Sequence, residues 1–433
     1  MTLTKIQLKP GIQKQTSDLG ASGGFTDCDN IRFRYGLPEK IGGWTKTTDS
    51  TLIGVVRDAH HWVSLDGTRL AALGTDKKLY IYANDILYDI TPARQTNSSV
   101  SNIFTTANGT PNVTVNITGH GASVGDIVTF SGTTGLSGTS FTAANFDRSF
   151  EVKSVTSTNA FVIQQDANET TGTVTTGTAT AVFDISIAPP SSTFGYGWGT
   201  STWNTETWNT PRSSSSVTLD GRDWSIDNFG ELMIATVLDG STFQWSPTND
   251  GLTGKASAVT NAPTASKFSL VSTPDRHLIL FGTEKTVGSG GSQDPLLLRF
   301  SSQEDINTYQ PTAENTAGSL RIQDGSTIVG ADKARGQILV WTDTSLHALQ
   351  FIGPPFTFGL NQLGRNCGLL GQHAGVVVRD VSYWMGQNAF FVFDGTVKKL
   401  PCTVDDFVFE NIDLTQTDQI FAGVNTEFAE IIW

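Results

Sequence analysis

The sequence predicts an all-β protein: a β-propeller body with a small β-barrel or sandwich domain inserted into it. Glycine, threonine and serine are abundant, with 44 glycines among 433 residues. Glycine supplies the dihedral angles of tight turns, while threonine, valine and aromatic residues suit a pleated surface. Only 16% of the residues are charged, so the chain lacks the balance of alanine, leucine, glutamate and lysine that is typical of helical proteins.

Five segments repeat one pattern, in which a short apolar strand, a turn with Gly or Asp and a second apolar strand follow one another. They span residues 69–91, 231–247, 277–301, 337–353 and 381–401. The starts of the last four recur at intervals close to the roughly 40–50 residues of a four-stranded propeller blade. We therefore expect an N-terminal entry segment over 1–50, a first blade over 51–96 and the remaining blades over 217–433.

Residues 97–185 interrupt this period with alternating strands of low charge, such as VTVNITGHGASVGDIVTFSG and GTVTTGTATAVFDI. We expect them to form the inserted β-domain, because compact insertions are tolerated where both of their ends lie close together. Residues 186–216 follow as a Trp/Ser-rich loop. The final FAEIIW is typical of a strand, and an open strand edge is normally avoided. We expect either another segment or a missing C-terminal part to complete the last blade.

Charge and cysteine content exclude several classes of protein. The net charge of −13 disfavours stable nucleic-acid binding through phosphate contacts. The three cysteines, Cys28, Cys367 and Cys402, form no CxxC pair, which makes a disulfide scaffold or a cysteine-based zinc site improbable. The N-terminus has no apolar signal region, and no apolar run reaches the length of a membrane span. We expect a soluble protein made in a reducing compartment.

The sequence contains motifs that could indicate catalysis or metal binding, but the residues around them do not provide the structure that such sites require. GASGG matches the nucleophile elbow of hydrolases around Ser22, but its flanks are polar loop rather than strand and helix. The adjacent His60 and His61 would point to opposite faces of a strand, so we expect no shared metal ion. Asp405 and Asp406, with Glu410 nearby, are expected to form a solvated acidic turn rather than a glycosidase or calcium site. We predict no catalytic, cofactor-binding or metal-binding residues and no enzymatic activity.

Three tryptophans recur every five residues in GYGWGTSTWNTETWNTPRS, namely Trp198, Trp203 and Trp208. Stacking sites for sugars or single-stranded bases use exposed aromatic residues, usually beside basic residues or a polar cluster. Arg212 is the only nearby positive charge. We therefore expect these tryptophans to be anchors that pack against the protein itself or a neighbouring subunit, with glycan and nucleic-acid binding as the alternatives.

Two parts of the sequence resemble the tail hub or nozzle proteins of short-tailed bacteriophages, also called packaged-DNA stabilisation proteins. The first is GIQKQTSDLGASGGFTDCDNIRFRYGLPEKIGGW, at 11–44. The second combines residues 339–371 with YWMGQNAFFVFDGTVKKLP, at 383–401. The resemblance implies a propeller body, six copies in a ring below the portal and adaptor, and a conduit that retains packaged DNA and opens for genome ejection.

The predicted function is therefore that of a structural virion protein of the short tail, assembled in the host cytoplasm. Its expected partners are further copies of itself, the tail adaptor above, tail tip, needle or fibre proteins, and DNA in transit. An acidic wall would repel the DNA backbone and let it pass. The alternative is a carbohydrate-binding or carbohydrate-cleaving propeller of a receptor-binding tail spike, and a cellular propeller scaffold is a third class.

Overall fold

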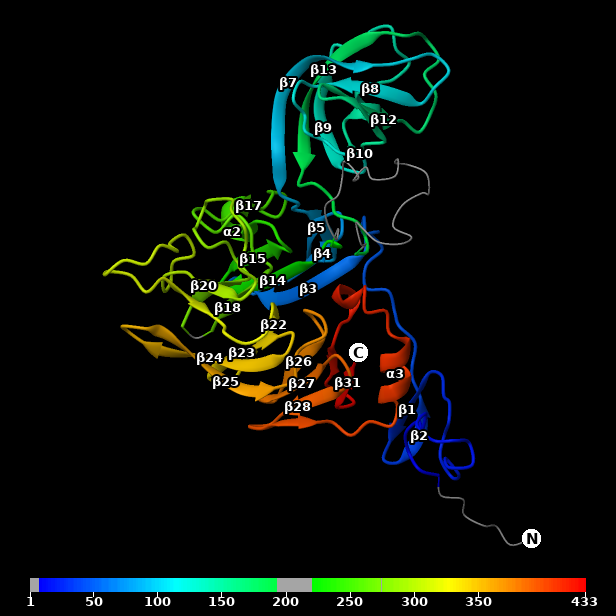
Figure 1. The fold of residues 1–433 in the computed structure, drawn as a ribbon. Coiled ribbons are helices and arrows are strands. Elements are labelled where there is room, and N and C mark those ends of the chain that lie inside the picture. The colour runs from blue at the N-terminus through cyan, green and yellow to red at the C-terminus, as the bar shows by residue number, and fades with distance from the viewer. Residues whose placement is uncertain (1–7, 193–219, 274) are drawn as a thin grey trace, which may run out of the picture. The chain divides into compact units, whose positions relative to one another are not determined.

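The computed structural model describes residues 8–192, 220–273 and 275–433 (Figure 1). Contacts divide the chain into two compact units. The middle unit comprises Ser50–Thr260, and the terminal unit comprises Met1–Asp49 with Asn261–Trp433. The fold is all-β, as predicted, and its main components are five four-stranded antiparallel sheets of the β-propeller blade type.

Two of the five blades lie in the middle unit, and in each the strands pair in chain order. Blade 1 contains β3 (Val56–Val63), β4 (Arg69–Thr75), β5 (Leu79–Ala83) and β6 (Ile86–Asp89). Blade 2 contains β14 (Trp224–Phe229), β15 (Leu232–Val237), β16 (Thr242–Trp245) and β17 (Ser257–Ala258), with the short helix α2 (Pro247–Asp250) before β17. One face of each sheet contributes to a shared apolar core that includes Trp62, Ile81, Trp224 and Trp245.

The other three blades lie in the terminal unit. Blade 3 contains β18 (Phe268–Ser272), β19 (His277–Phe281), β20 (Leu297–Phe300) and β21 (Gly318–Arg321). Blade 4 contains β22 (Ile328–Ala334), β23 (Gln337–Thr342), β24 (Ser345–Gly353) and β25 (Thr357–Arg365). Blade 5 contains β26 (Gly375–Val378), β27 (Val381–Met385), β28 (Phe390–Phe393) and β29 (Val397–Lys399). Apolar side chains of adjacent blades pack into two cores, one between blades 3 and 4 and one between blades 4 and 5.

A seven-stranded antiparallel sheet with its own core stands between the strands of blades 1 and 2 in the sequence. Its strand order is β10-β9-β13-β7-β8-β12-β11. The elements are β7 (Ala93–Thr105), β8 (Asn112–Asn116), β9 (Ile127–Thr134), α1 (Ala143–Phe146), β10 (Ser149–Glu151), β11 (Ser154–Ser157), β12 (Ala160–Gln164) and β13 (Thr175–Asp184). We call this sheet the insert; its closure into a barrel or sandwich stays a prediction.

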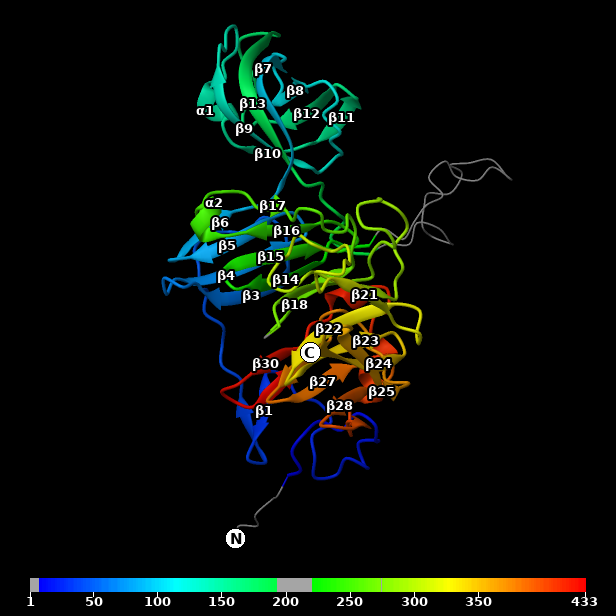
Figure 2. The same cartoon turned by 90° about the vertical axis from the view of Figure 1, so that its left-hand side faces the viewer.

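Both ends of the chain form small hairpins in the terminal unit. β1 (Ile31–Arg34) pairs with β2 (Leu37–Lys40), and β30 (Gly423–Asn425) pairs with β31 (Glu430–Ile432). The helix α3 (Asp405–Asn411) and a 3-10 turn (Thr417–Gln419) connect blade 5 to β30. The two hairpins lie next to each other (Figure 2). They are in contact, since the guanidinium of Arg32 in β1 stacks 3.5 Å from the ring centre of Phe428, between β30 and β31.

Candidate functional site

The predicted anchors Trp198, Trp203 and Trp208 lie outside the described residues, as does most of the predicted 186–216 loop. Their packing against the protein or a neighbouring subunit stays a prediction. The search for a site therefore concerns the remaining candidates and the surface that the structure does describe.

Ser22 lies in a series of turns and is exposed. Its backbone N–H donates to the carbonyl of Leu19, and no strand precedes it directly and no helix follows it. A hydrolase nucleophile needs a strand-to-helix turn that holds its hydroxyl at the edge of a sheet. The geometry of Ser22 therefore provides none of the features of a nucleophile elbow.

His60 and His61 lie on β3 and have different environments. The Nε2 atom of His60 lies 2.8 Å from Oδ1 of Asn228 and 3.9 Å from Oδ1 of Asp227. His61 is exposed and faces a pocket instead. Within the described ranges, no group of three His, Cys, Asp or Glu side chains could hold a metal ion.

Asp405 and Asp406 begin helix α3. The expectation of a solvated acidic turn is wrong for Asp405, which is buried, whereas Asp406 and Glu410 are exposed. The carboxylate of Asp405 accepts a hydrogen bond from the side-chain amide of Gln15, and Lys399 Nζ lies 3.3 Å away. Asp405 therefore fastens the N-terminal segment to the C-terminal one instead of meeting solvent.

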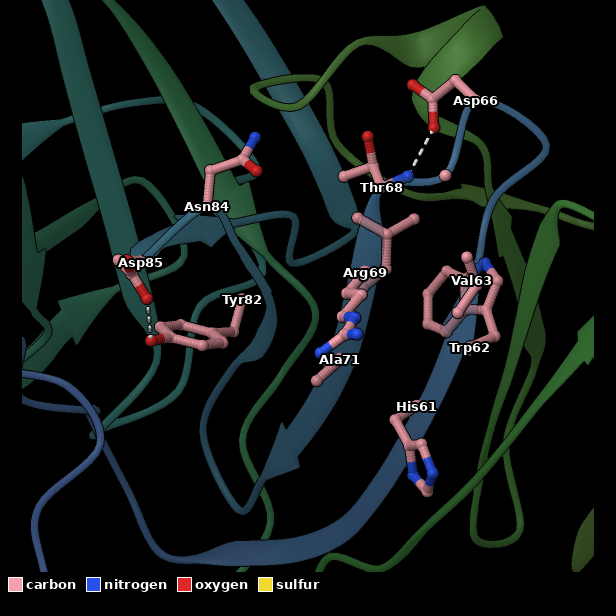
Figure 3. A pocket seen from close by; sticks show the side chains of 12 residues that line it. His61, Trp62, Val63, Asp66, Thr68, Arg69, Ala71, Tyr82, Asn84 and Asp85 are labelled. Atoms are coloured by element: carbon pink, nitrogen blue, oxygen red, sulfur yellow. Dashed lines mark hydrogen bonds between the residues drawn. The ribbon is translucent and has the colours of Figure 1, made fainter.

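A pocket of about 930 Å³ lies on blade 1, over β3, β4 and the β5–β6 turn (Figure 3). The pairing of the strands brings side chains of one face together, since Ala71 lies opposite both His61 and Tyr82, and Val63 lies opposite Arg69. Alternate residues of these strands, among them Trp62, turn into the core on the other face. The pocket is thus the open face of a blade.

Both carboxylates of the pocket are held by neighbouring groups. Asp66 accepts hydrogen bonds from the Ser64 hydroxyl and from the backbone N–H of Thr68, at 2.8 Å, and these bonds lower the pKa of Asp66. The Tyr82 hydroxyl donates to Asp85 at 2.9 Å, which raises the pKa of Tyr82 (Figure 3). Each carboxylate stabilises its own turn, so neither is placed as a general acid or base.

Three polar side chains of the pocket remain available to a ligand. Among the described residues, the side chains of His61, Arg69 and Asn84 have no hydrogen-bond or ion-pair partner. A guanidinium, an imidazole, an amide and the ring of Tyr82 therefore border one open surface. Sequence reasoning missed this group, although Arg69 and Tyr82 occupy same-face positions of a predicted blade, because nothing in the sequence shows which face stays uncovered.

A cluster of four charges, of which Lys78 and Asp184 are buried, links blade 1, blade 2 and the insert. Lys78 is 2% exposed and its ammonium contacts Asp89 and, at 3.5 Å, Asp184, which is 0% exposed. Lys255 donates to Asp184 at 2.8 Å and to the carbonyl of Thr91 at 3.0 Å. Burial opposes both charges of the Lys78–Asp89 pair, yet their attraction raises the pKa of Lys78 and lowers that of Asp89. This cluster ties the last strand of the insert to both blades, and its four charges are paired with one another.

Two further buried carboxylates organise loops. Glu169 accepts backbone hydrogen bonds from Ser140 and Thr171, both at 2.8 Å, and these and the Thr139 hydroxyl lower its pKa to about 2 although burial opposes the shift. Hydrogen bonds likewise lower the pKa of Glu284 against the opposing effect of burial, and one of them comes from the backbone N–H of Gly290 at 3.1 Å. Carboxylates engaged in this way stabilise the fold.

No helix in the described part of the chain is long and apolar enough to cross a membrane.

No protein-family model and no curated protein matches the sequence. Among solved structures, a phage phi92 endosialidase matches over 78% of this chain and 44% of its own, at 13% identity and a TM-score of 0.20. The extracellular domain of the one component system BT4673 from B. thetaiotaomicron matches over 87% and 36%, at 10% identity and a TM-score of 0.31. BBS1N, in complex with ARL6DN, matches over 81% and 82%, at 11% identity and a TM-score of 0.29. This chain spans less than half the length of the first two proteins, and these low scores assign no function.

Proposed function

We propose that this chain is a non-enzymatic structural protein of the virion, the tail hub or nozzle of a short-tailed bacteriophage. Support comes from the sequence resemblance at 11–44, 339–371 and 383–401, and from the propeller blades that this family implies. In this role copies of the chain form a ring, six in the family, below the portal and adaptor. The ring retains packaged DNA and conducts it at ejection.

One observation carries the proposal of subunit contact: an exposed apolar arm at residues 31–44. Within it Tyr35 is 91% exposed, Leu37 is 68% exposed and Trp44 is 95% exposed. Large apolar side chains gathered on one exposed segment indicate an interaction site rather than a solvated surface. The arm lies in the N-terminal run that carries the resemblance, so we assign it to contact with a neighbouring copy or the adaptor.

The net charge of −13 suits a conduit. A channel wall that bound phosphates would slow the passage of DNA, whereas an acidic wall repels the backbone. Ring assembly multiplies this charge around one axis. The partners in this reading are further copies, the adaptor above and tip, needle or fibre proteins, and the DNA contact is transient.

The test is mass photometry of the chain alone and with the purified portal–adaptor complex, followed by cryo-EM of the particle. Replacing Tyr35, Leu37 and Trp44 together by serine should abolish ring formation and leave the melting temperature unchanged, because none of the three is buried. Leu65→Ser is the matched control, since Leu65 is 91% exposed on another turn. A wild-type chain that stays monomeric with the adaptor present would refute the proposal.

The pocket on blade 1 favours a second candidate, a carbohydrate-binding module of a tail spike. Aromatic faces and free polar donors are the groups with which proteins bind sugars, and Tyr82, Arg69 and Asn84 supply both. Cleavage is not favoured, since Asp66 and Asp85 are held in their own turns. A glycan array run with wild type and Tyr82→Ala decides: specific binding that the variant loses supports this candidate, and an empty array rejects it.

A further inference from the structure

The pocket on blade 1 has a small side chain at its centre and a ring on either side. Ala71 of β4 lies opposite His61 of β3 and opposite Tyr82 of β5, and all three line the pocket. Neighbouring strands lie about 5 Å apart, so the strands that carry the imidazole and the phenol are separated by about 10 Å. Because alanine ends in a methyl group, the space above it has room for one ring of a sugar.

The ring of Tyr82 is held in a fixed orientation. Its hydroxyl donates to Asp85, three residues further along in the β5–β6 turn, at 2.9 Å. The side chain remains partly exposed on the pocket side of the sheet. A group that is already ordered loses little conformational freedom when a ligand packs on it. Tyr82 therefore offers a preorganised apolar face for the C–H groups of a sugar ring.

Arg69 supplies the positive charge of the pocket. In the ranges that the structure describes its guanidinium forms no ion pair, although Asp66 and Asp85 line the same pocket. Asp66 instead accepts the backbone N–H of Thr68 at 2.8 Å, and Asp85 accepts the Tyr82 hydroxyl. A guanidinium presents a planar fork of donors that fits a carboxylate through two parallel hydrogen bonds. Arg69 is therefore available to a carboxylate that arrives with a ligand.

The strand register places the amide of Asn84 beside Arg69, at one end of the pocket. Leu70 of β4 pairs with Ala83 of β5, and continuing that register brings Arg69 next to Asn84. Arg69 lies two residues before Ala71, which is about 7 Å along the strand. Figure 3 shows the Arg69 side chain extended along β4 toward Ala71. A sugar ring seated over Ala71 therefore directs an acidic substituent to the guanidinium.

We propose that the pocket on blade 1 binds a saccharide that carries a carboxylate. Arg69 pairs with the carboxylate, Asn84 donates to a hydroxyl beside it, and one sugar ring stacks on Tyr82. The exposed His61 borders the opposite side of that ring. The inference rests on the carbohydrate-binding module, the second candidate function above, and adds the class of sugar that such a module selects.

The test applies the 433-residue chain to an array of neutral, carboxylated and sulfated oligosaccharides, in which each uronic acid is matched by its methyl ester. The saccharides that bind should carry a carboxylate. Isothermal titration calorimetry then compares the strongest acidic ligand with its ester, which should bind at least tenfold more weakly. Raising the ionic strength should weaken binding of the acid and leave that of the ester nearly unchanged.

Variants assign the charge and the stacking contact to separate residues. Arg69→Gln should weaken binding of the acid at least tenfold and that of the ester less than twofold, because the ester has no charge to pair. Tyr82→Ala should weaken both ligands by a similar factor, since stacking does not depend on the carboxylate. Arg335→Gln is the matched control and should leave both affinities within twofold, because Arg335 is an 85% exposed arginine outside the pocket.

The outcomes separate this inference from the candidate function on which it rests. Neutral saccharides bound as tightly as acidic ones, or sulfated saccharides bound alone, would overturn the inference and leave the carbohydrate-binding module in place. Equal weakening of acid and ester by Arg69→Gln would also overturn it, since the guanidinium would then not recognise the charge. An array on which no saccharide binds would reject the module itself and this inference with it.

Discussion

The indole N–H of Trp224 donates to the carbonyl oxygen of Thr75 at 2.7 Å and so joins blade 2 to blade 1. The close approach requires glycine at position 74, because a Cβ there would lie 2.6 Å from the Trp224 ring. Trp224 is 1% exposed, so this contact belongs to the core that the two blades share.

Gly74→Ala should therefore destabilise the protein by about 1–3 kcal/mol, the usual effect of overpacking a core. Trp224→Phe should cost about 1–2 kcal/mol, since it leaves the Thr75 carbonyl unpaired. Urea denaturation measures both changes. Gly43→Ala is the matched control, because its added Cβ meets nothing within 4 Å. Equal stability of the two alanine variants would contradict the close approach of Trp224.

Lys78→Met should destabilise the middle unit by about 3 kcal/mol, the low end for breaking a buried pair, because Asp89 loses its ammonium partner while Asp184 keeps Lys255. Combining it with Asp184→Asn should cost clearly less than the sum of the single changes, as groups in one network are coupled. Lys77→Met, at a partly exposed neighbouring position, serves as the control. Strictly additive free energies of unfolding would show that the cluster does not act as a unit.

Acid should weaken the insert through Glu169. Its pKa is lowered to about 2 in the folded chain from 4.5, so its contribution is present above about pH 4.5 and is lost as the pH falls toward 2. At neutral pH this amounts to at most about 3 kcal/mol. The free energy of unfolding, measured between pH 2 and pH 7 by urea denaturation followed by far-UV circular dichroism, should depend less on pH for Glu169→Gln. The exposed Glu314→Gln should keep the wild-type pH dependence.

Arg32→Ala should loosen the N-terminal hairpin, since the Arg32 guanidinium stacks on Phe428 and lies 3.6 Å from Glu430. The side chain is 11% exposed, and a partly desolvated cation–π contact contributes about 1–2 kcal/mol. Chymotrypsin should then cleave after Tyr35 several-fold faster. Arg335→Ala removes an arginine that is 85% exposed and should leave the cleavage rate unchanged. Equal rates for both variants would speak against the contact.

The blade pattern was predictable because each segment combines local signals. Strands β4 and β5 are rich in apolar residues and are joined by a short turn at 76–78 that begins with Asp76. The repeated pattern left out the first strand of each blade, such as β26 with GVVV or β14 with WSIDNF, although a strand at His60 and His61 was expected in the first blade. These strands lie before the strand–turn–strand pattern, so each repeat recognised from the sequence began at the second strand of its blade.

The contacts that connect distant segments were not predictable. Lys78 and Asp184 are ordinary surface types, and only the folded pairing brings them together beside Lys255. Helix α3 was missed for a related reason: the apolar run FVF within DDFVFEN consists of residue types that favour strands, and the contact of Asp405 with Gln15 arises from tertiary packing. The pocket on blade 1 likewise depends on which sheet face remains uncovered.

Ala93 and Asp184 are partners across β7 and β13, so the polypeptide enters and leaves the insert at one point. Such a cassette can be exchanged for another module, or replaced by a short turn, without stretching the blades on either side. Asp184 must stay with the protein that receives a new module, because its carboxylate and that of Asp89 together balance the ammonium groups of Lys78 and Lys255. The boundary of any graft is therefore set by electroneutrality as well as by chain geometry.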